Sequence, residues 1–564
     1  MNLALLLDPA FRACAARLRR VPGAEPSIES FADRQVLRVE PALLRTLAFE
    51  AFRDINFLFR SSHLEGWARI LADPRASDNE RFVAAALLKN AAISAEGVLP
   101  TCQDTGTATV FGLKGEEVRT GADDFQALEE GIVKAYSECN LRFSQVAPVT
   151  MLDDIDTRTN LPAQIDVSAV PASSPGGNEY RLLFVAKGGG SANRTSFHQE
   201  TRALLNVSAL ERFLAERIRG LGVAGCPPYY IGVVIGGTSP ESNLKILKLA
   251  TAGALDWLPD LAAAGKGAAA SGNANLGSPG SSRSPGSSRS PAFRDSLWEA
   301  KVLAMAAETG LGAQFGGSHL ALEARVIRLA RHAASLPVSV GVSCSAHRNA
   351  LARIGADGAW LEDFDRNPAR FLDRALAVLG RSAAAAPRIL LDQPPRAVCA
   401  ELGQHPAGTL VLLSGRMVVA RDAAHARLAR MLQEGKPLPR YFLDHPVYYA
   451  GPANTPPGHL IGSFGPTTAQ RMDSYVRAFM AAGASLMMIA KGNRSKDVVA
   501  ACKEHGGFSL GTIGGAGSLI TRDHIVAEKL VDFADLGFEA VRIIEVKDLP
   551  AFIVIDDKGN SLYG

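Results

Sequence analysis

The stretch Tyr229–Ser239, YYIGVVIGGTS, decides the fold class, because an apolar run of strand length ends there in a glycine-rich turn. The same pattern recurs at Arg181–Asn193 (RLLFVAKGGGSAN), Val338–His347 (VSVGVSCSAH) and Ser485–Ser495 (SLMMIAKGNRS). Helical stretches lie between such runs, at Ser208–Gly222 (SALERFLAERIRGLG) and Asp422–Gly435 (DAAHARLARMLQEG). Strands that alternate with helices predict an α/β protein.

Two features divide the chain. Residues 265–291, GKGAAASGNANLGSPGSSRSPGSSRSP, contain almost no large apolar side chain, so they cannot bury enough surface to offset the entropy of ordering. We expect a disordered insertion there. Residues 382–395, SAAAAPRILLDQPP, mark a second boundary. The sequence therefore predicts a large N-terminal domain, residues 1–380, and a C-terminal domain, residues 390–564, of ordinary domain size.

The composition excludes several classes of protein. The 564 residues are 47% hydrophobic and 21% charged, with a net charge of +3 and no long block of one sign, so we expect no nucleic-acid partner. No apolar stretch is long enough to span a membrane. We expect a cytoplasmic protein. Four arginines near the start leave a mitochondrial transit peptide as the alternative: Arg12, Arg17, Arg19 and Arg20.

Three of the seven cysteines stand in loop-like contexts. Cys102 lies in LPTCQDTGTA, Cys226 in GVAGCPPYYIG and Cys344 in VGVSCSAHRN. The other four stand in helix-like settings and resemble packing residues: Cys14, Cys139, Cys399 and Cys502. An odd number of cysteines in a long chain fits a reducing compartment. Because no CxxC pair occurs, spacing alone leaves open an iron cluster, a three-ligand zinc site or no metal.

Several long segments resemble class I, iron-sulfur-dependent fumarate hydratases over nearly the whole chain. They occur in the family's order: VLPTCQDTGTA from Val98, AKGGGSANR from Ala186, CPPYYIGVVIGGTSPESNLK from Cys226, GLGAQFGG from Gly310, DHPVYYAGPANTP from Asp444 and GPTTAQRMDSY from Gly465. The resemblance implies an enzyme that interconverts (S)-malate and fumarate. It also implies a large cluster-binding α/β domain, a smaller swivelling-type α/β domain and a homodimer.

The cofactor follows from the same resemblance. In the family, three cysteines hold a [4Fe-4S] cluster, and the matching positions are Cys102, Cys226 and Cys344. Three thiolates leave one iron without a protein ligand, and such an iron can act as a Lewis acid toward a substrate oxygen.

The resemblance also implies the catalytic residues. Asp104, two positions after Cys102, would donate the proton to the leaving water, with His332 near it. Thr467 would be the base. We expect the residues after the threonine pair to form the first turn of a helix, which would place Thr467 and Arg471 on one helical face.

A larger set would bind the dicarboxylate substrate. Arginine and lysine can clamp its carboxylates, and the glycine turn at Gly188–Gly190 can offer backbone NH groups. The candidates are Gln103, Asp104, Arg142, Gly190, Asn193, Arg194, Thr195, Gln199, Arg421, Thr467, Thr468, Arg471 and Lys491.

Two other functions compete. A related dehydratase acting on tartrate or 2-methylmalate needs the same clamp and cluster, and a non-catalytic iron-sulfur sensor needs only the cysteines. The sensor has no use for an aspartate beside a ligand or for a separate Thr-Arg pair.

Overall fold

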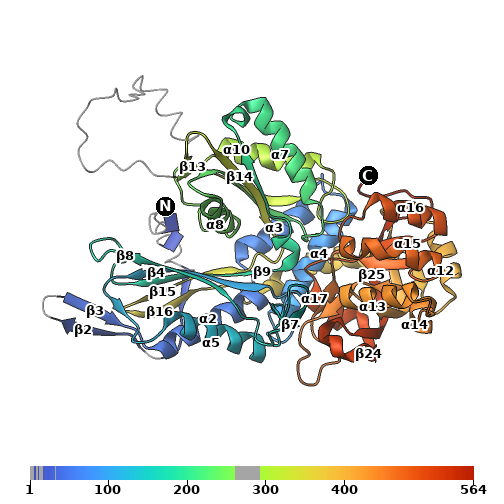
Figure 1. Cartoon of the computed structure of the whole chain (residues 1–564), viewed down its shortest axis with the longest axis horizontal. Helices are drawn as coiled ribbons and strands as arrows, with labels where there is room; N and C mark the ends of the chain where they lie inside the picture. The colour runs from blue at the N-terminus through green and yellow to red at the C-terminus, as the bar shows by residue number, and fades with distance from the viewer. Residues whose placement is uncertain (1–5, 8–9, 12–16, 24, 32–33, 261–291) are drawn as a thin grey trace.

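The computed structural model describes residues 6–7, 10–11, 17–23, 25–31, 34–260 and 292–564. The insertion predicted at 265–291 lies outside these residues, as do Arg12 and Cys14. The described residues form three large sheets with helices packed between and around them, so the predicted α/β class is confirmed (Figure 1).

The first sheet contains the strand that follows the Cys102 loop in the sequence, Thr107–Gly115. Its six strands lie in the order β1 (Leu18–Arg20), β16 (Gly358–Glu362), β15 (Asn349–Gly355), β9 (Tyr180–Lys187), β4 (Thr107–Gly115) and β8 (Gln164–Val170). Helices α2 (Pro41–Phe57) and α5 (Asp124–Glu138) pack on one face in a shared core (Figure 1). They approach closely at Gly131, where a Cβ would meet the Arg45 carbonyl oxygen at 2.4 Å.

The second sheet supplies two of the three cysteine loops. Its strands lie in the order β10 (Ser196–Glu200), β14 (Leu336–Ser343), β11 (Tyr229–Gly237), β13 (Ala321–Arg331) and β12 (Ala292–Arg294). Helix α8 (Pro240–Thr251) fills the core between this sheet and the first. Helices α7 (Val207–Leu221) and α10 (Ser296–Glu308) cover the opposite face (Figure 1).

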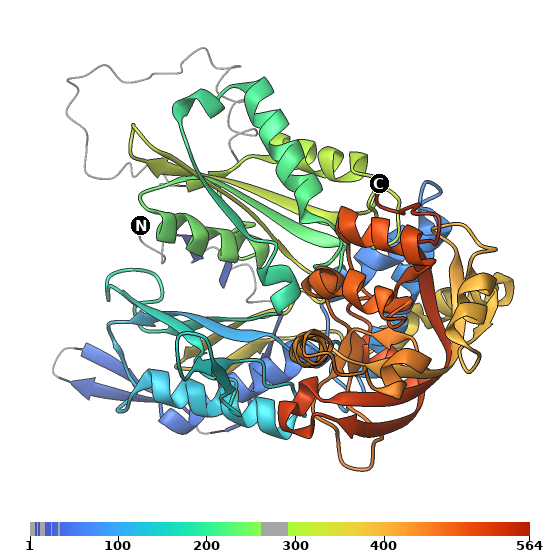
Figure 2. The ribbon, with the colours of Figure 1, turned by 45° about the vertical axis from the view of Figure 1, so that its right-hand side comes forward.

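The third sheet closes on itself. Its strands lie in the order β17 (Arg388–Leu390), β18 (Leu410–Val419), β19 (Val447–Tyr448), β22 (Met487–Ala490), β23 (Phe508–Gly511), β25 (Val541–Ile555) and β24 (Ile525–Asp532), and β18 also pairs with β25. Around it lie α12 (Pro395–Leu402), α13 (Asp422–Gln433), α14 (Arg440–Asp444), α15 (Asp473–Ala481), α16 (Lys496–His505) and α17 (Gly517–His524) (Figure 2).

Helices from the N-terminal half pack directly on this third sheet. They are α3 (Ser61–Ala72), α4 (Asp78–Ser94) and α11 (Leu372–Ala385). Phe82 of α4 meets Phe552 of β25 edge to face, with ring centroids 5.8 Å apart. Helix α4 begins at a capping box, because the Ser77 side chain accepts from the Glu80 NH and the Glu80 side chain accepts from the Ser77 NH.

Shorter elements connect the sheets. They are β2 (Ser27–Phe31), β3 (Arg34–Arg38), β5 (Val118–Arg119), β6 (Val146–Pro148), β7 (Asp154–Asp156), β20 (Ala450–Pro452), β21 (Phe464–Pro466), α6 (Gly189–Ala192) and the 3-10 turns η2 (Arg202–Leu204), η3 (Pro368–Phe371), η4 (Ala469–Met472) and η5 (Ala534–Glu539).

The four apolar runs quoted above form β11, β9, β14 and β22, and the two helical stretches form α7 and α13, as predicted. Among the arginines near the start of the chain, Arg19 lies in strand β1 and pairs with Glu50 and Asp54 of α2. None of the helices in the described part of the chain combines the length and apolar character needed to cross a membrane. The division at 1–380 and 390–564 stays a prediction.

Candidate active site

The three loop cysteines come together through the second sheet. Cys226 lies three positions before β11 and Cys344 directly follows β14, and these strands are antiparallel neighbours with Tyr230 opposite Ser343. Both cysteines therefore lie at the same end of this strand pair, where the Ser345 NH donates to the Cys226 carbonyl at 2.9 Å. Cys226 itself has φ 63°, a left-handed conformation that costs a non-glycine residue about 1 kcal/mol or more.

Cys102 lies near the other two cysteines, and of the three Cys102 and Cys226 are buried while Cys344 is half-buried. Burial raises the pKa of Cys226 to about 11, against Lys491, and the nearby Cys102 and Cys344 add to the rise. Burial also raises the pKa of Cys102, against Arg348 and Lys491. The Lys491 ammonium donates to the Cys226 sulfur at 2.9 Å. The thiols thus face a common interior space lined by cations.

Glycines form the wall beside these thiols. A Cβ on Gly514 would lie 2.3 Å from the Cys226 sulfur, and one on Gly517 would lie 3.1 Å from the Cys102 Cα. Gln314 holds this wall in place, because its amide donates to the carbonyls of Pro227 and Gly514 at 2.9 Å each. A side chain at either glycine would displace a cysteine.

Among the residues that the structure describes, no group of three or more His, Cys, Asp and Glu side chains is arranged to hold a single metal ion. The cysteines of an iron-sulfur cluster bind different iron atoms, so they need to line a shared space rather than converge on one point.

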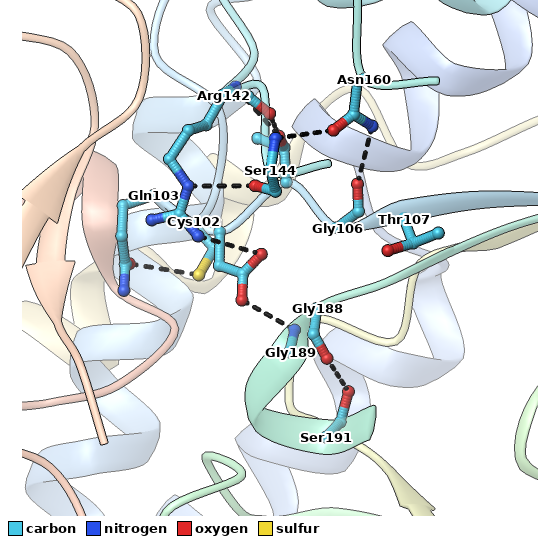
Figure 3. A network of polar contacts seen from close by, with 12 residues as sticks. Cys102, Gln103, Gly106, Thr107, Arg142, Ser144, Asn160, Gly188, Gly189 and Ser191 are labelled. Carbon is cyan, nitrogen blue, oxygen red and sulfur yellow. Dashed lines mark hydrogen bonds and ion pairs between the residues drawn. The ribbon is translucent and has the colours of Figure 1, made fainter. Parts of the chain in front are cut away.

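Arg142 and Gly189 approach the Cys102 loop from different sides (Figure 3), and both hold the Asp104 carboxylate. Its Oδ1 pairs with Arg142 Nη2 at 3.3 Å, and its Oδ2 accepts from the Gly189 NH at 2.9 Å. The Arg348 guanidinium donates to the Asp104 carbonyl at 2.7 Å. Burial alone would raise the pKa of Asp104, yet Arg142, Arg348 and Lys491 together hold that pKa below its ordinary value. Asp104 is therefore a carboxylate at neutral pH.

Gln103, Thr467 and Lys491 connect the cysteine loops to the third sheet. The Gln103 amide donates to the Pro466 carbonyl at 3.1 Å, next to Thr467. The Lys491 NH donates to the Thr467 carbonyl at 3.1 Å, so these residues lie side by side. Burial lowers the pKa of Lys491, but Cys226 and Cys102 raise it further than burial lowers it. Lys491 therefore carries a full positive charge beside the thiols.

The expected helical pairing of Thr467 with Arg471 is wrong. Thr467 follows strand β21 and precedes the 3-10 turn η4, which starts at Ala469. The Thr467 NH donates to the Tyr449 carbonyl at 2.7 Å and keeps the residue extended, outside the helix. Only Arg471 belongs to the turn. Its guanidinium forms a two-bond pair with Asp422, at 2.8 and 2.7 Å.

Two of the arginines proposed to clamp the substrate, Arg421 and Arg471, come from the part of the chain that forms the third sheet. Arg421 is the more buried of the two, with 6% of its side chain exposed. Burial lowers its pKa to about 10, against Glu539, and Arg142 and Arg471 lower it further. Glu539 pairs with Arg421 Nη2 at 3.1 Å. The Arg421 Nε and Nη1 atoms are buried and have no hydrogen-bond partner among the described residues. Because Nε lies 3.8 Å from Asp422 Oδ2, Nη1 is the donor that remains available to a bound anion.

Comparisons with known proteins agree with this arrangement. Residues 45–353 match the family described as "Fumarate hydratase (Fumerase)", and residues 358–564 match "Fumarase C-terminus". The chain is 47% identical to the class I, aerobic fumarate hydratase of Escherichia coli over 95% of this chain and 92% of that protein. It is 48% identical to fumarate hydratase 2 of Leishmania major over 96% of this chain and 91% of that protein.

The chain belongs to the class I fumarate hydratase family. The assignment made from the sequence motifs, and with it the assignment as a hydro-lyase, is confirmed. A more distant relative is the putative L(+)-tartrate dehydratase subunit alpha of Methanocaldococcus jannaschii, 27% identical over 48% of this chain and 84% of that protein.

Some residues that the fumarate hydratase motifs suggested lie apart from this group within one chain. His332 is exposed in the turn after β13, and Gln199 of β10 pairs with Pro337 at the start of β14. Cys344 follows the other end of β14, whose eight residues span roughly 25 Å. The structure does not bring His332 and Gln199 to Asp104 of the same chain, because β14 holds them at its far end.

The glycine-turn candidates divide. Gly190 lies at the site, where a Cβ would be 3.4 Å from the Lys491 ammonium. Arg194 packs against Gly225, beside Cys226. Asn193 and Thr195 are exposed on the loop after α6. The NH group predicted to bind an anion does so at Gly189, but the anion is the Asp104 carboxylate.

Sequence reasoning missed Arg348 and Phe538. Arg348 stands four residues after Cys344, so its proximity to a proposed ligand was a usable signal. It is buried, and its guanidinium donates to the backbone carbonyl of Asp104. Phe538, in LGFEAV, gave no local signal, because only the tertiary fold brings it between Arg142 and Arg421.

Proposed function

We propose that this chain interconverts fumarate and (S)-malate at a [4Fe-4S] cluster held by Cys102, Cys226 and Cys344. The observation that carries the proposal is the convergence of three loop thiols, separated by more than one hundred residues each, on one buried space with Asp104. Membership of the class I family supports the same reaction.

The residues around the thiols fit such a cluster. Thiolates are the usual ligands of iron-sulfur clusters, and an anionic group needs nearby positive charge when it is buried. Lys491 and Arg348 supply that charge, since both favour the thiolate form of Cys102. The glycine wall at Gly514 leaves room that any side chain would fill. When bound, the cluster would supply an iron free of protein ligands as a Lewis acid toward a substrate oxygen.

Asp104 would move one proton. In the dehydration of malate it would donate the proton to the departing water, and in the hydration of fumarate it would accept a proton from water. Its lowered pKa suits the accepting role in the substrate-free enzyme. Gly189 and Arg142 fix the carboxylate from both oxygens. We propose Thr467 as the base for the carbon-bound proton, because it is buried beside Lys491.

The cations would clamp the dicarboxylate. Arg421 offers its buried Nη1, which makes no hydrogen bond among the described residues, and Arg142 and Lys491 come from other elements. Arg471 would release or share Asp422 when it binds a carboxylate. Further proposed contacts are Gln103, Gly190, Asn193, Arg194, Thr195 and Thr468. Two or more cations per carboxylate provide orientation as well as affinity.

The proposal also keeps the homodimer and the cytoplasmic location that the resemblance and composition suggested. Sedimentation of the purified enzyme measures the first, and fractionation of cells that express the full chain measures the second.

Anaerobic turnover tests the function. The reconstituted enzyme should hydrate fumarate to (S)-malate faster than it dehydrates tartrate or 2-methylmalate at equal concentration. A higher kcat/KM for tartrate would instead assign the chain the activity named for its relative from Methanocaldococcus jannaschii. Absence of turnover on all three substrates by cluster-loaded protein would leave the sensor as the better reading.

A further inference from the structure

A segment outside the predicted site reaches its centre. The 3-10 turn η5 (Ala534–Glu539) connects β24 to β25 and contains Gly537 with φ 58° and ψ −116°. That conformation breaks the turn directly before Phe538 and redirects the chain, which is then anchored by the Ala540 NH donating to the Gly537 carbonyl at 3.1 Å. This turn places the Phe538 side chain against the guanidinium groups of Arg142 and Arg421.

The Phe538 ring lies against two clamp arginines. The guanidinium carbon of Arg142 is 5.7 Å from the ring centroid, and that of Arg421 is 5.3 Å from it. Both distances fall within the range of cation-π contacts. Arg142 comes from the loop after α5, whereas Arg421 precedes α13. One aromatic ring therefore touches carboxylate-binding groups from both halves of the chain.

The next residue fixes how Arg421 meets a ligand. Glu539 pairs with Arg421 Nη2 at 3.1 Å, while its other oxygen accepts from the Ala423 NH at 2.8 Å. Phe538 lies against the Arg421 guanidinium, Glu539 pairs with Nη2, and Asp422 Oδ2 lies 3.8 Å from Nε, so Nη1 is the donor left to bind a carboxylate. The segment thus defines the side from which a carboxylate is bound.

We propose that Phe538 is a specificity-determining residue, which selects unsubstituted four-carbon dicarboxylates over those with a substituent on the carbons between the carboxylates. This inference rests on the proposed function. The ring contacts both Arg142 and Arg421, the side chains proposed to bind the carboxylates, so it would bound the space in which a methyl group on the carbons between those carboxylates has to fit. A pocket wall can discriminate one methyl group by roughly 10- to 200-fold.

The test uses the anaerobically reconstituted holoenzyme with Phe538→Ala and, in case the larger deletion disturbs folding, Phe538→Leu. We expect kcat/KM for 2-methylfumarate, relative to fumarate, to rise at least about tenfold in Phe538→Ala and by less in Phe538→Leu. The inhibition constant of 2-methylsuccinate relative to succinate should fall in parallel, which reports binding without turnover.

Phe533→Ala is the matched control. Phe533 stands at the start of the same segment and also contacts an arginine, Arg427, at 5.2 Å, but that arginine pairs with Asp535 outside the clamp. We expect the substrate ratio to stay at the wild-type value in this variant.

Equal losses for fumarate and 2-methylfumarate in the Phe538 variants would overturn the inference, because they would show a role in folding or clamp geometry alone. So would an unchanged ratio of inhibition constants. A wild-type holoenzyme that does not hydrate fumarate would instead overturn the proposed function, so the two failures are distinguishable.

Discussion

At the scale of single residues, the chemistry depends on how Asp104 is held. Its carboxylate is fixed by Gly189 and Arg142, and Arg348 holds its backbone. The sequence placed Asp104 beside a proposed ligand, and the lowered pKa adds that the substrate-free enzyme keeps it ionised. Nothing local in the sequence could give that charge state, since the cations come from distant segments.

Asp104→Asn should lower kcat roughly 10²- to 10⁴-fold and leave KM nearly unchanged, because asparagine keeps the size of the side chain but cannot transfer the proton. Anaerobic steady-state kinetics on protein with full iron content measures both constants. A variant that keeps more than about a tenth of the wild-type kcat would remove Asp104 from the proton-transfer role.

Arg471→Ala should raise KM and lower kcat together, because the guanidinium would bind a carboxylate in the ground state and stabilise added charge in the transition state. Arg477→Ala is the control, since Arg477 is similarly exposed on α15 and pairs with Asp497 and Glu504 away from the clamp. Equal kinetics in the two variants would show that Arg471 only stabilises the surface through Asp422.

At the scale of elements, the sequence predicted what local patterns control. Apolar runs gave β9, β11, β14 and β22 because alternation and length determine strands locally. The turn after the threonine pair begins at Ala469, as predicted, but Thr467 does not share its face with Arg471, because the Tyr449 carbonyl accepts from the Thr467 NH and holds Thr467 in an extended ladder. That hydrogen bond joins distant segments, which periodicity cannot reveal.

The start of α4 gives a prediction for stability. His319 contacts Glu80 Oε2 at 3.2 Å and Asp73 Oδ2 at 3.3 Å. The Glu80 hydrogen bond, opposed by burial, raises the pKa of His319 above 6.5. Folding therefore favours protonated His319. Its contribution is complete below pH 6.5, and it is lost as the pH rises through the folded-state pKa.

His319→Gln should therefore destabilise the protein by roughly 1.5 to 3 kcal/mol at about pH 6, the range for hydrogen bonds to charged groups, and by less at about pH 8.5. The apparent Tm of wild type and variant at the two pH values measures this. A Tm difference that grows with pH would contradict the assigned charge pairing.

At the scale of the whole molecule, the site exists only because three separate parts of the chain meet. Strands β11 and β14 bring Cys226 and Cys344 to the same end of this strand pair, the loop before β4 adds Cys102, and the third sheet adds Lys491 and Arg421. Motif resemblance predicted most of these members. It could not give Phe538, whose role depends on the closed third sheet carrying η5 to the clamp.

Oxygen should inactivate the enzyme, because a cluster held by three thiolates leaves one iron open to solvent and easily lost. Ferrous iron with a thiol reductant should restore activity under anaerobic conditions. Activity that persists through prolonged aerobic treatment with a chelator would argue against an exposed iron.

The most direct test of the central claim is anaerobic iron and sulfide analysis of purified, reconstituted protein, with cysteine-to-serine variants compared side by side. We predict about four iron and four sulfide per wild-type chain. Cys102→Ser, Cys226→Ser and Cys344→Ser should each lose most of this content, while Cys399→Ser and Cys502→Ser, which replace buried thiols of α12 and α16, should keep it. Full iron content in Cys102→Ser, or its loss in Cys399→Ser, would contradict the account.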